Sequence, residues 1–212
     1  MRDERGRTET RRLVLLRHGR TEWNATHRIQ GQLDPGLDDT GRAEARAVAP
    51  VVAALGPAVL WSSDLARARE TAEQVAAASR LVPTYDERLR EFHLGERQGL
   101  THAEYERLAP EEFARFRAGE WDEVPGAEHP EAAAKRYAAA LHDLLATLAP
   151  GETGVVVSHG AVTRTGLVSF LGWPRETARD LRALGNCARV ELHERAVGRW
   201  ALAAYNVLPV VE

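Results

Sequence analysis

Two continuous apolar runs mark the predicted core of the chain. Leu13 to Leu16 and Val155 to Val157 contain no polar residue, and each is followed by one polar residue and a His-Gly pair. A strand covered on both faces loses the alternation of apolar and polar residues, so such runs are typical of central strands in a parallel sheet. We expect both runs to be buried strands of this kind.

Apolar residues recur at helical spacing in three longer segments. They predict helices over roughly Thr40 to Leu55, Asp64 to Ala78 and Glu128 to Leu148. Pro50 lacks a backbone N–H, so we expect it to kink or shorten the first helix. The third helix carries one apolar stripe that we interpret as core packing, made of Ala134, Tyr137, Ala138, Leu141, Leu145 and Leu148.

Shorter patterns complete the predicted sheet. Ala58 to Trp61 is typical of a short strand, and Ser62-Ser63-Asp64 after it supplies residues that are preferred at a helix N-cap. Cys187 to His193 and Trp200 to Asn206 are predicted as two closing strands.

The segment Leu94 to Gly126 interrupts the alternation of strands and helices. It contains short helical patterns around Pro110 and several Gly and Pro residues. We interpret roughly 94–127 as an inserted lid region within a single domain of residues 12–212. The fold class expected is therefore α/β, with three α/β/α layers, a mostly parallel central sheet and an inserted helical lid. Residues 1–11 contain no apolar residue after Met1, so we expect a flexible N-terminal arm.

Composition excludes several classes of protein. Of the 212 residues, 44% are hydrophobic and the formal net charge is -3, which argues against broad binding to nucleic acid or anionic lipid. No apolar stretch approaches the roughly 20 residues that cross a bilayer, and no export signal precedes Arg12. The single cysteine, Cys187, allows no intrachain disulfide and no cysteine zinc site. We therefore expect a cytoplasmic protein.

The two His-Gly pairs suggest a ligand site. Ligands bind at the carboxyl ends of strands in open α/β sheets, which is where the pattern places His18 and His159. Arg17 precedes the first of them, and Arg67 lies near the start of a predicted helix; a guanidinium fork matches phosphate oxygens. The alternatives are a structural role for either histidine alone and a surface ion pair of Arg67 with Glu70 or Asp64.

At this point the residues carry a family resemblance. Leu16 to Asn24, with the sequence LRHGRTEWN, resembles the signature of the histidine phosphatase superfamily in its phosphoglycerate-mutase-like branch. Further blocks follow in the family's order and extend the match over nearly all of the chain after the arm: Gln30-Gly31, Leu37 to Gly41, Ser62 to Ala68, Leu89-Arg90-Glu91 and Ser158-His159-Gly160.

The resemblance implies roles for individual residues. His18 would be the nucleophile, because a neutral imidazole has an unshared pair and a phosphohistidine splits one displacement into two steps. Glu91 would give a proton to the leaving group and then activate water; the alternative is an exposed glutamate paired with a neighbouring arginine. The remaining residues would hold the substrate: Arg17, Arg67 and His159 around the transferred group, Asn24 as a hydrogen-bond donor to it, and Gln30 and Gly31 beside it.

The predicted function is that of a metal-independent phosphomonoesterase. No cofactor is implied, and His18 and His159 have no carboxylate or cysteine at ligand spacing beside them, so no metal site is expected. The substrate would be a small phosphorylated metabolite, and the protein a monomer or homodimer. Two alternatives are phosphoglycerate mutase-type transfer, disfavoured by the short interval from Glu91 to His159, and a non-catalytic phosphate-binding member of the family, disfavoured by the intact set of site residues.

Within the family, Leu89 to Glu104 with Gly185-Asn186 is most similar to the actinobacterial glucosyl-3-phosphoglycerate phosphatases and their broad-specificity relatives. Arg97 departs from that pattern, since many members have an aromatic residue there. It would either favour a second anionic group on the substrate or face water. Residues 113–128, with Trp121 and Pro125, are expected to shape the substrate site. His93 and His102 would lie at its rim or in solvent.

Overall fold

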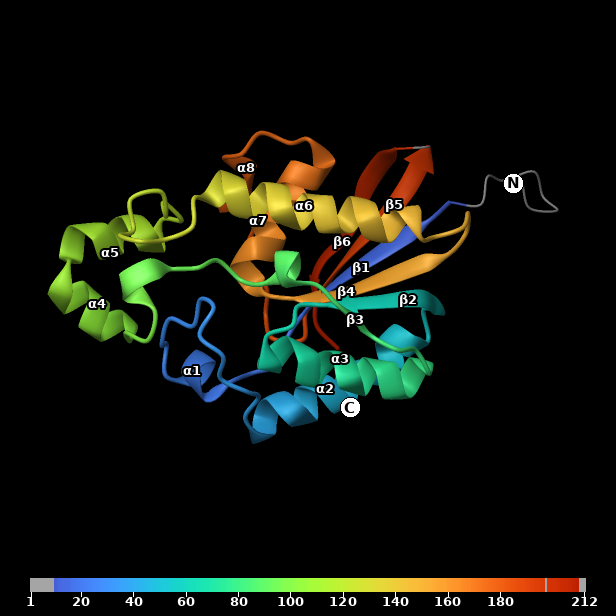
Figure 1. The fold of residues 1–212 in the computed structure, drawn as a ribbon, viewed down its shortest axis with the longest axis horizontal. Helices are drawn as coiled ribbons and strands as arrows, with labels where there is room; N and C mark the ends of the chain where they lie inside the picture. Colours follow the sequence, from blue (N-terminus) through green and yellow to red (C-terminus); the bar gives the residue numbers. More distant parts are fainter. Residues whose placement is uncertain (1–9, 197, 210–212) are drawn as a thin grey trace.

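The two apolar runs form neighbouring parallel strands at the centre of a six-stranded sheet (Figure 1). The computed structural model describes residues 10–196 and 198–209. Within this part the strand order is β3-β2-β4-β1-β5-β6. The strands are β1 (Arg12–Arg17), β2 (Pro57–Ser62), β3 (Thr84–Tyr85), β4 (Thr153–Ser158), β5 (Arg189–Ala196) and β6 (Arg199–Val207).

Strand direction follows the sequence prediction. The first four strands are mutually parallel, whereas β5 runs antiparallel to β1 and pairs with β6 as an antiparallel hairpin at the edge. The expected α/β fold with a mostly parallel sheet is therefore confirmed, and the two closing strands supply its antiparallel part.

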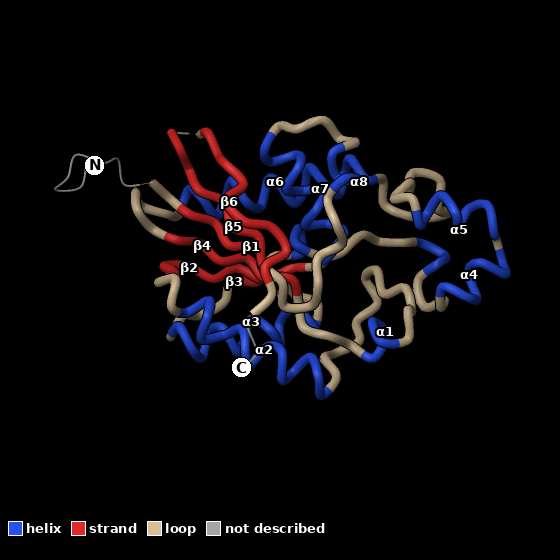
Figure 2. Tube along the Cα trace, turned by 180° about the vertical axis from the view of Figure 1, so that it is seen from behind, coloured by secondary structure: helices blue, strands red, loops and turns tan. Residues whose placement is uncertain are grey.

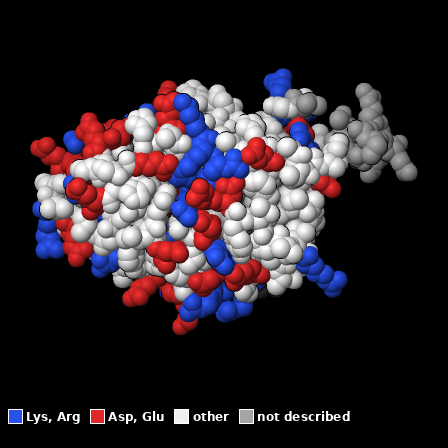
Figure 3. All heavy atoms as spheres, in the orientation of Figure 1, with Lys and Arg blue, Asp and Glu red and all other residues white. Residues whose placement is uncertain are grey.

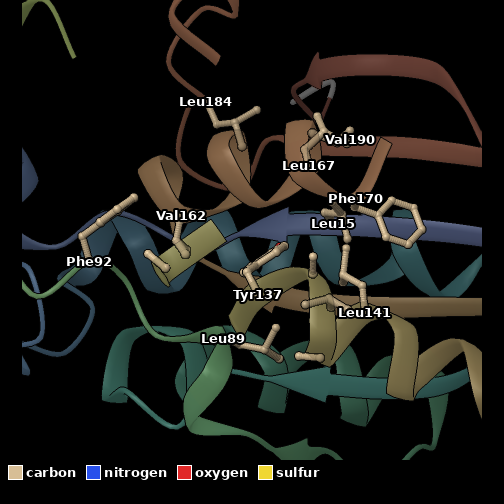
Figure 4. Packing of buried hydrophobic residues seen from close by; sticks show 14 of the residues in the cluster. Leu15, Leu89, Phe92, Tyr137, Leu141, Val162, Leu167, Phe170, Leu184 and Val190 are labelled. Atoms are coloured by element: carbon tan, nitrogen blue, oxygen red, sulfur yellow. The ribbon is translucent and has the colours of Figure 1, made fainter. Parts of the chain in front are cut away.

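The central strands are buried on both faces because helices cover both faces of the sheet. Val14 and Leu16 of β1 pack into the cluster with α2 (Asp39–Ala53) and α3 (Ala66–Ser79). Leu13 and Leu15 point the other way, into the cluster with α6 (Pro130–Ala146) and α7 (Gly160–Leu171). Figure 4 shows Leu15, Tyr137, Leu141 and Leu167 gathered in this second cluster.

The helix α7 was not among the predicted helices, and neither were the short helices α1 (Glu22–Ala25) and α8 (Thr177–Asp180). Thr163, Thr165 and Gly166 give α7 a weak intrinsic preference for helix. Its packing compensates: a Cβ at Gly166 would collide with the ring of Tyr137 on α6. Close helix–helix contact, which the local pattern does not reveal, therefore selects this helix.

Two local predictions were wrong in detail. α2 continues through Pro50 and ends at Ala53, so the proline precedes the end by less than one turn. The N-cap of α3 is Leu65, which offers no side-chain cap, and not the Ser62-Ser63-Asp64 cluster. Instead, the Asp34 carboxylate, from a distant loop, accepts a hydrogen bond from the Ala66 N–H at 2.6 Å.

Residues 94–127 lie beyond the carboxyl ends of the parallel strands (Figures 1 and 2). They contain the 3₁₀ turn η2 (Gly95–Arg97) and the helices α4 (His102–Leu108) and α5 (Pro110–Arg117), and they follow the turn η1 (Glu87–Leu89) in the chain. Aromatic rings hold this region together, among them Tyr105, Phe113 and Phe116. The segment predicted as a lid thus stands over the edge of the sheet where both His-Gly pairs end.

Most of the predicted arm, residues 1–9, lies outside the described residues. Arg11, its last residue, belongs to the fold, because its guanidinium pairs with the buried Glu194 carboxylate at 2.6 Å. Over the described ranges, no helix combines the length and apolar character needed to cross a membrane. Figure 3 shows acidic and basic side chains interspersed over one face of the molecule.

Candidate active site

The register of the two central strands brings His18 and His159 together. Arg17 pairs with Ser158 across β1 and β4, so the residues that follow emerge side by side. The ring centroids of His18 and His159 are 5.2 Å apart. His18 Nδ1 lies 2.7 Å from the Gly19 carbonyl oxygen. Since a carbonyl can only accept, Nδ1 carries the proton and Nε2 keeps its unshared pair.

Two arginines lie beside these rings, Arg67 buried and Arg17 half-buried. Arg67 is 1% exposed and donates to the carbonyls of Gly31 at 2.8 Å and Leu33 at 2.9 Å. Its alternative interpretation as a surface ion pair is wrong, because Asp64 pairs with Arg90 instead. Arg17 donates to the Leu184 carbonyl. Three buried nitrogens have no hydrogen-bond partner within the described part of the chain: Arg17 Nε, Arg67 Nε and His159 Nδ1.

These contacts make a site that favours an anion. Burial, with the charges of Arg67 and Arg17, lowers the pKa of His18 well below its usual value. Burial and the same arginines also lower the pKa of His159 well below its usual value. The pKa of Arg67 is lowered by burial to about 10, so this side chain stays charged at neutral pH. One buried and one half-buried cation beside two neutral imidazoles therefore present a positive field with unpaired donors.

Glu91 is held by backbone N–H groups and not by a neighbouring arginine, so the alternative of an exposed glutamate–arginine pair is wrong. Its Oε1 accepts from the N–H of Phe92 at 3.0 Å and of Val162 at 2.8 Å, and its Oε2 accepts from Ala161 at 3.0 Å. Ala161 and Val162 lie in the first turn of α7, where the helix dipole favours a negative group. The carboxyl group consequently has a fixed position next to His18.

Asn24, Gln30 and Gly31 also line the cavity that contains His18. Asn24 Oδ1 accepts from the Thr21 backbone N–H at 3.1 Å and from Asn186 Nδ2 at 3.3 Å, which leaves the Asn24 amide N–H groups available as donors. Gln30 accepts from the Thr21 hydroxyl. The carbonyl of Gly31 is used by Arg67, so this residue positions a cation.

The cavity has a volume of about 260 Å³. Besides the predicted site residues, aromatic and apolar side chains and two further nitrogen-bearing side chains line it. These are Arg28, Ile29, Phe92, Leu94, His102, Phe116, Trp121 and Ala161. From the segment 113–128, Phe116 and Trp121 reach the cavity, whereas Pro125 does not. His102 lines the cavity and His93 is exposed.

Neither interpretation of Arg97, a contact with a second anionic group or a side chain facing water, is correct, and Arg28, which the sequence reasoning missed, lines the cavity instead. Arg97 is only 11% exposed and forms a two-point ion pair with Glu112 at 2.8 and 2.9 Å, so it neither lines the cavity nor faces water. Arg28 lines the cavity, and its guanidinium lies over the Trp23 ring at 5.7 Å. Its place two residues before Gln30 of the Gln30-Gly31 block was the available signal.

The described residues contain no group of three or more His, Cys, Asp or Glu side chains able to hold a metal ion. The donors gathered around His18 are instead nitrogen donors. They suit phosphate oxygens.

Comparison with known proteins agrees with this site. Residues 13–208 match the model of the histidine phosphatase superfamily (branch 1). A glucosyl-3-phosphoglycerate phosphatase of Mycolicibacterium vanbaalenii is 38% identical over 212 residues, which covers 92% of this chain and 94% of that protein. Phosphoglycerate mutase-like protein 4 of Arabidopsis thaliana is 40% identical over 157 residues, covering 72% of this chain and 68% of that protein.

A solved structure of mycobacterial glucosyl-3-phosphoglycerate phosphatase in complex with VO3 superposes with a TM-score of 0.86 at 36% identity. The match covers 93% of this chain and 99% of that one. The resemblance carried by the sequence blocks and the expectation of a phosphatase are thereby confirmed. The chain belongs to the histidine phosphatase superfamily, in its branch 1.

Proposed function

We propose that this protein hydrolyses a small phosphorylated metabolite through a phosphohistidine at His18 Nε2. The observation that carries the proposal is the hydrogen bond between His18 Nδ1 and the Gly19 carbonyl, which fixes the proton on Nδ1 and leaves Nε2 as the nucleophile. Arg17 and Arg67 flank it with positive charge and with buried Nε–H groups that have no partner among the described residues. These donors would meet the phosphoryl oxygens as negative charge develops on them.

The first step forms one bond and breaks one. The Nε2 lone pair attacks phosphorus, the phosphorus–oxygen bond to the leaving group breaks, and Glu91 gives its proton to the departing oxygen. Asn24 would donate an amide N–H to the transferred group.

The second step returns the site to its starting state. Glu91, now a carboxylate, takes a proton from water while the water oxygen attacks phosphorus and the phosphorus–nitrogen bond breaks. His18 regains its neutral form because burial beside two cations disfavours an imidazolium. Nitrogen donors and one carboxyl group therefore suffice for the full cycle.

The lining of the cavity supports a substrate class. Phe116 and Trp121 offer faces that pack against a sugar ring, while Arg28 and His102 offer polar contacts. We propose a phosphorylated sugar acid, for which glucosyl-3-phosphoglycerate, the substrate named for the 38% identical relative, is the first candidate. Arg28 would then face the carboxylate of the substrate.

Two further proposals concern the setting in which the protein works. The single cysteine, Cys187, is buried, which agrees with a reducing compartment such as the cytoplasm. We retain a monomer or homodimer as the expected form, and size-exclusion chromatography with light scattering distinguishes the two.

The test begins with an aryl phosphate, in the presence of a chelator. The purified protein should hydrolyse it, His18→Ala should abolish hydrolysis, and quenching in an alkaline denaturant should trap an acid-labile, base-stable phosphoryl group on the wild type alone. Loss of activity with the chelator, or a turnover that persists in His18→Ala, would contradict the proposal. A panel of phosphorylated sugars, sugar acids and nucleotides then ranks substrates, and transfer of phosphate to phosphoglycerate in place of water would indicate a mutase.

A further inference from the structure

Ser63 contacts the ring of His159 through its hydroxyl, although no catalytic role was expected for it. It follows the last residue of β2, and its N–H donates to the Val157 carbonyl at 2.9 Å. The side chain is fully buried. Ser63 Oγ lies 2.9 Å from His159 Nε2 and accepts a hydrogen bond from the Leu65 N–H at 3.3 Å. The hydroxyl therefore joins the strand end, the start of α3 and the second histidine.

The donors and acceptors in this contact can be counted. A serine hydroxyl has one O–H donor and two lone pairs, and one lone pair of Ser63 is used by Leu65. Within the described part of the chain, His159 Nε2 is the one acceptor within hydrogen-bond distance of the Ser63 O–H group. If the O–H donates to Nε2, this nitrogen carries no proton. A neutral ring then has its single N–H at Nδ1, one of the three buried nitrogens without a partner.

The opposite tautomer is disfavoured on two grounds. With the proton on Nε2, the Ser63 O–H would be left without an acceptor in a site with no exposed surface, which costs free energy. In addition, Nδ1 would carry a bare lone pair. The unpartnered nitrogens of Arg17, Arg67 and His159 all belong to side chains around His18, and a lone pair among them would repel the oxygens of a phosphoryl group.

We propose that Ser63 is a positioning residue that fixes His159 in the Nδ1–H tautomer, so that this N–H donates to the transferred phosphoryl group. The inference rests on the proposed function for its kinetic consequence, but the tautomer itself is a property of the resting protein. The neighbour Ser62 offers a matched control. It is equally buried, yet its hydroxyl donates to the Ser63 carbonyl at 2.8 Å and does not touch His159.

The kinetic experiment compares Ser63→Ala, Ser63→Thr and Ser62→Ala with the wild type on one aryl phosphate. In the other tautomer His159 loses its N–H contact to the charged phosphoryl group, which is typically worth about 10- to 100-fold. We expect Ser63→Ala to lower kcat by about this factor with a smaller change in KM, Ser63→Thr to recover part of it, and Ser62→Ala to stay within about 3-fold of wild type. In a His159→Ala background, Ser63→Ala should have almost no further effect. An unchanged kcat in Ser63→Ala, or a full additional loss in the His159→Ala background, overturns the proposal.

The spectroscopic experiment uses protein labelled with ¹⁵N-histidine, without substrate. In the wild type, His159 should show a protonated Nδ1 and an unprotonated Nε2, and Ser63→Ala should move the ring toward the other tautomer. A wild-type His159 with its proton on Nε2 overturns the proposal even if the enzyme is active. If instead the protein has no phosphatase activity but shows the expected tautomer, the proposed function fails while the Ser63–His159 contact stands.

Discussion

Val162 donates its backbone N–H to the Glu91 carboxylate at 2.8 Å, which ties the segment after η1 to the first turn of α7. The two residues are 71 positions apart in the chain. Because the same turn follows His159 directly, the contact fixes the Glu91 carboxylate relative to this histidine. The proposed nucleophile, His18, thus follows a sheet strand, and a helix N-terminus holds the carboxyl group.

Glu91→Gln should lower the turnover of alkyl phosphates by about 10²–10⁴-fold and that of aryl phosphates much less. Glutamine keeps the size of the side chain and one acceptor oxygen but has no proton to give, and phenolates leave without one more readily than alkoxides. The measurement is kcat/KM for a series of esters that differ in leaving-group pKa. Equal losses across the series would remove Glu91 from its role as the acid.

Arg136→Gln should impair the same step without touching the substrate. Arg136 of α6 donates to the carbonyls of Arg88 and Arg90, both at 2.7 Å, and of Glu91 at 3.0 Å, while Glu128 holds its other edge. Losing this brace should cost about 2 kcal/mol of stability and weaken turnover of alkyl more than of aryl phosphates.

Arg90→Gln is the control for that change, because Arg90 lies on the same segment but pairs outward with Asp64. It should leave the ratio of alkyl to aryl turnover unchanged. If both variants alter the ratio alike, Arg136 has no specific part in placing Glu91. Urea unfolding measures the loss of stability, and the ester series measures the change in the ratio of alkyl to aryl turnover.

Arg28 and Arg97 should separate substrate recognition from stability. Arg28→Gln is expected to raise KM for a phosphorylated sugar acid by about 10-fold, as for the loss of one charge-assisted hydrogen bond, and to change KM for an uncharged aryl leaving group little. Arg97→Gln should leave both KM values unchanged and lower the melting temperature, because Arg97 pairs with Glu112 inside the lid region. The reverse pattern would place the second anionic group of the substrate near Arg97.

Stability should fall as the pH drops below about 6.5, the usual pKa of an unfolded histidine. Burial beside two arginines lowers the pKa values of His18 and His159 well below that value in the folded protein. Between the two pKa values the unfolded state binds more protons, so acid favours unfolding. Urea unfolding at pH 7.5, 6.5 and 5.5 should show a loss of about 1–2 kcal/mol over the last step. His18→Asn should reduce this slope, and an unchanged slope would contradict the neutral, buried imidazole.

The ion pair at the start of the fold also loses its contribution as the pH falls, but in a more acidic range. Arg11 and a backbone N–H lower the pKa of Glu194 to about 2, so its contribution is present above the unfolded value of about 4.3 and is lost as the pH falls toward 2. Glu194→Gln should cost about 1–2 kcal/mol at pH 7 and progressively less below pH 4. The exposed pair of Glu131 with Lys135 is the control, and Glu131→Gln should cause no measurable loss.

The sequence alone was sufficient for the parts of the protein that depend on local periodicity and on contiguous motifs. Uninterrupted apolar runs identified β1 and β4, because a strand buried on both faces tolerates no polar position. The ordered blocks around His18, Arg67, Glu91 and His159 indicated a family and a phosphatase. Three of these residues, His18, Arg67 and Glu91, line one cavity in the structure. His159 lies next to His18.

Only the tertiary structure decided what depends on contacts between distant segments. The sequence could not tell that Arg97 would be neutralised by Glu112 and that Arg28 would line the cavity, because each arginine contacts residues that are distant in the chain. Nor could it place Ser63 against His159, 96 positions away. The opening strands determine the nucleophile His18 locally, whereas its charge state, its donors and the shape of its substrate cavity arise from packing.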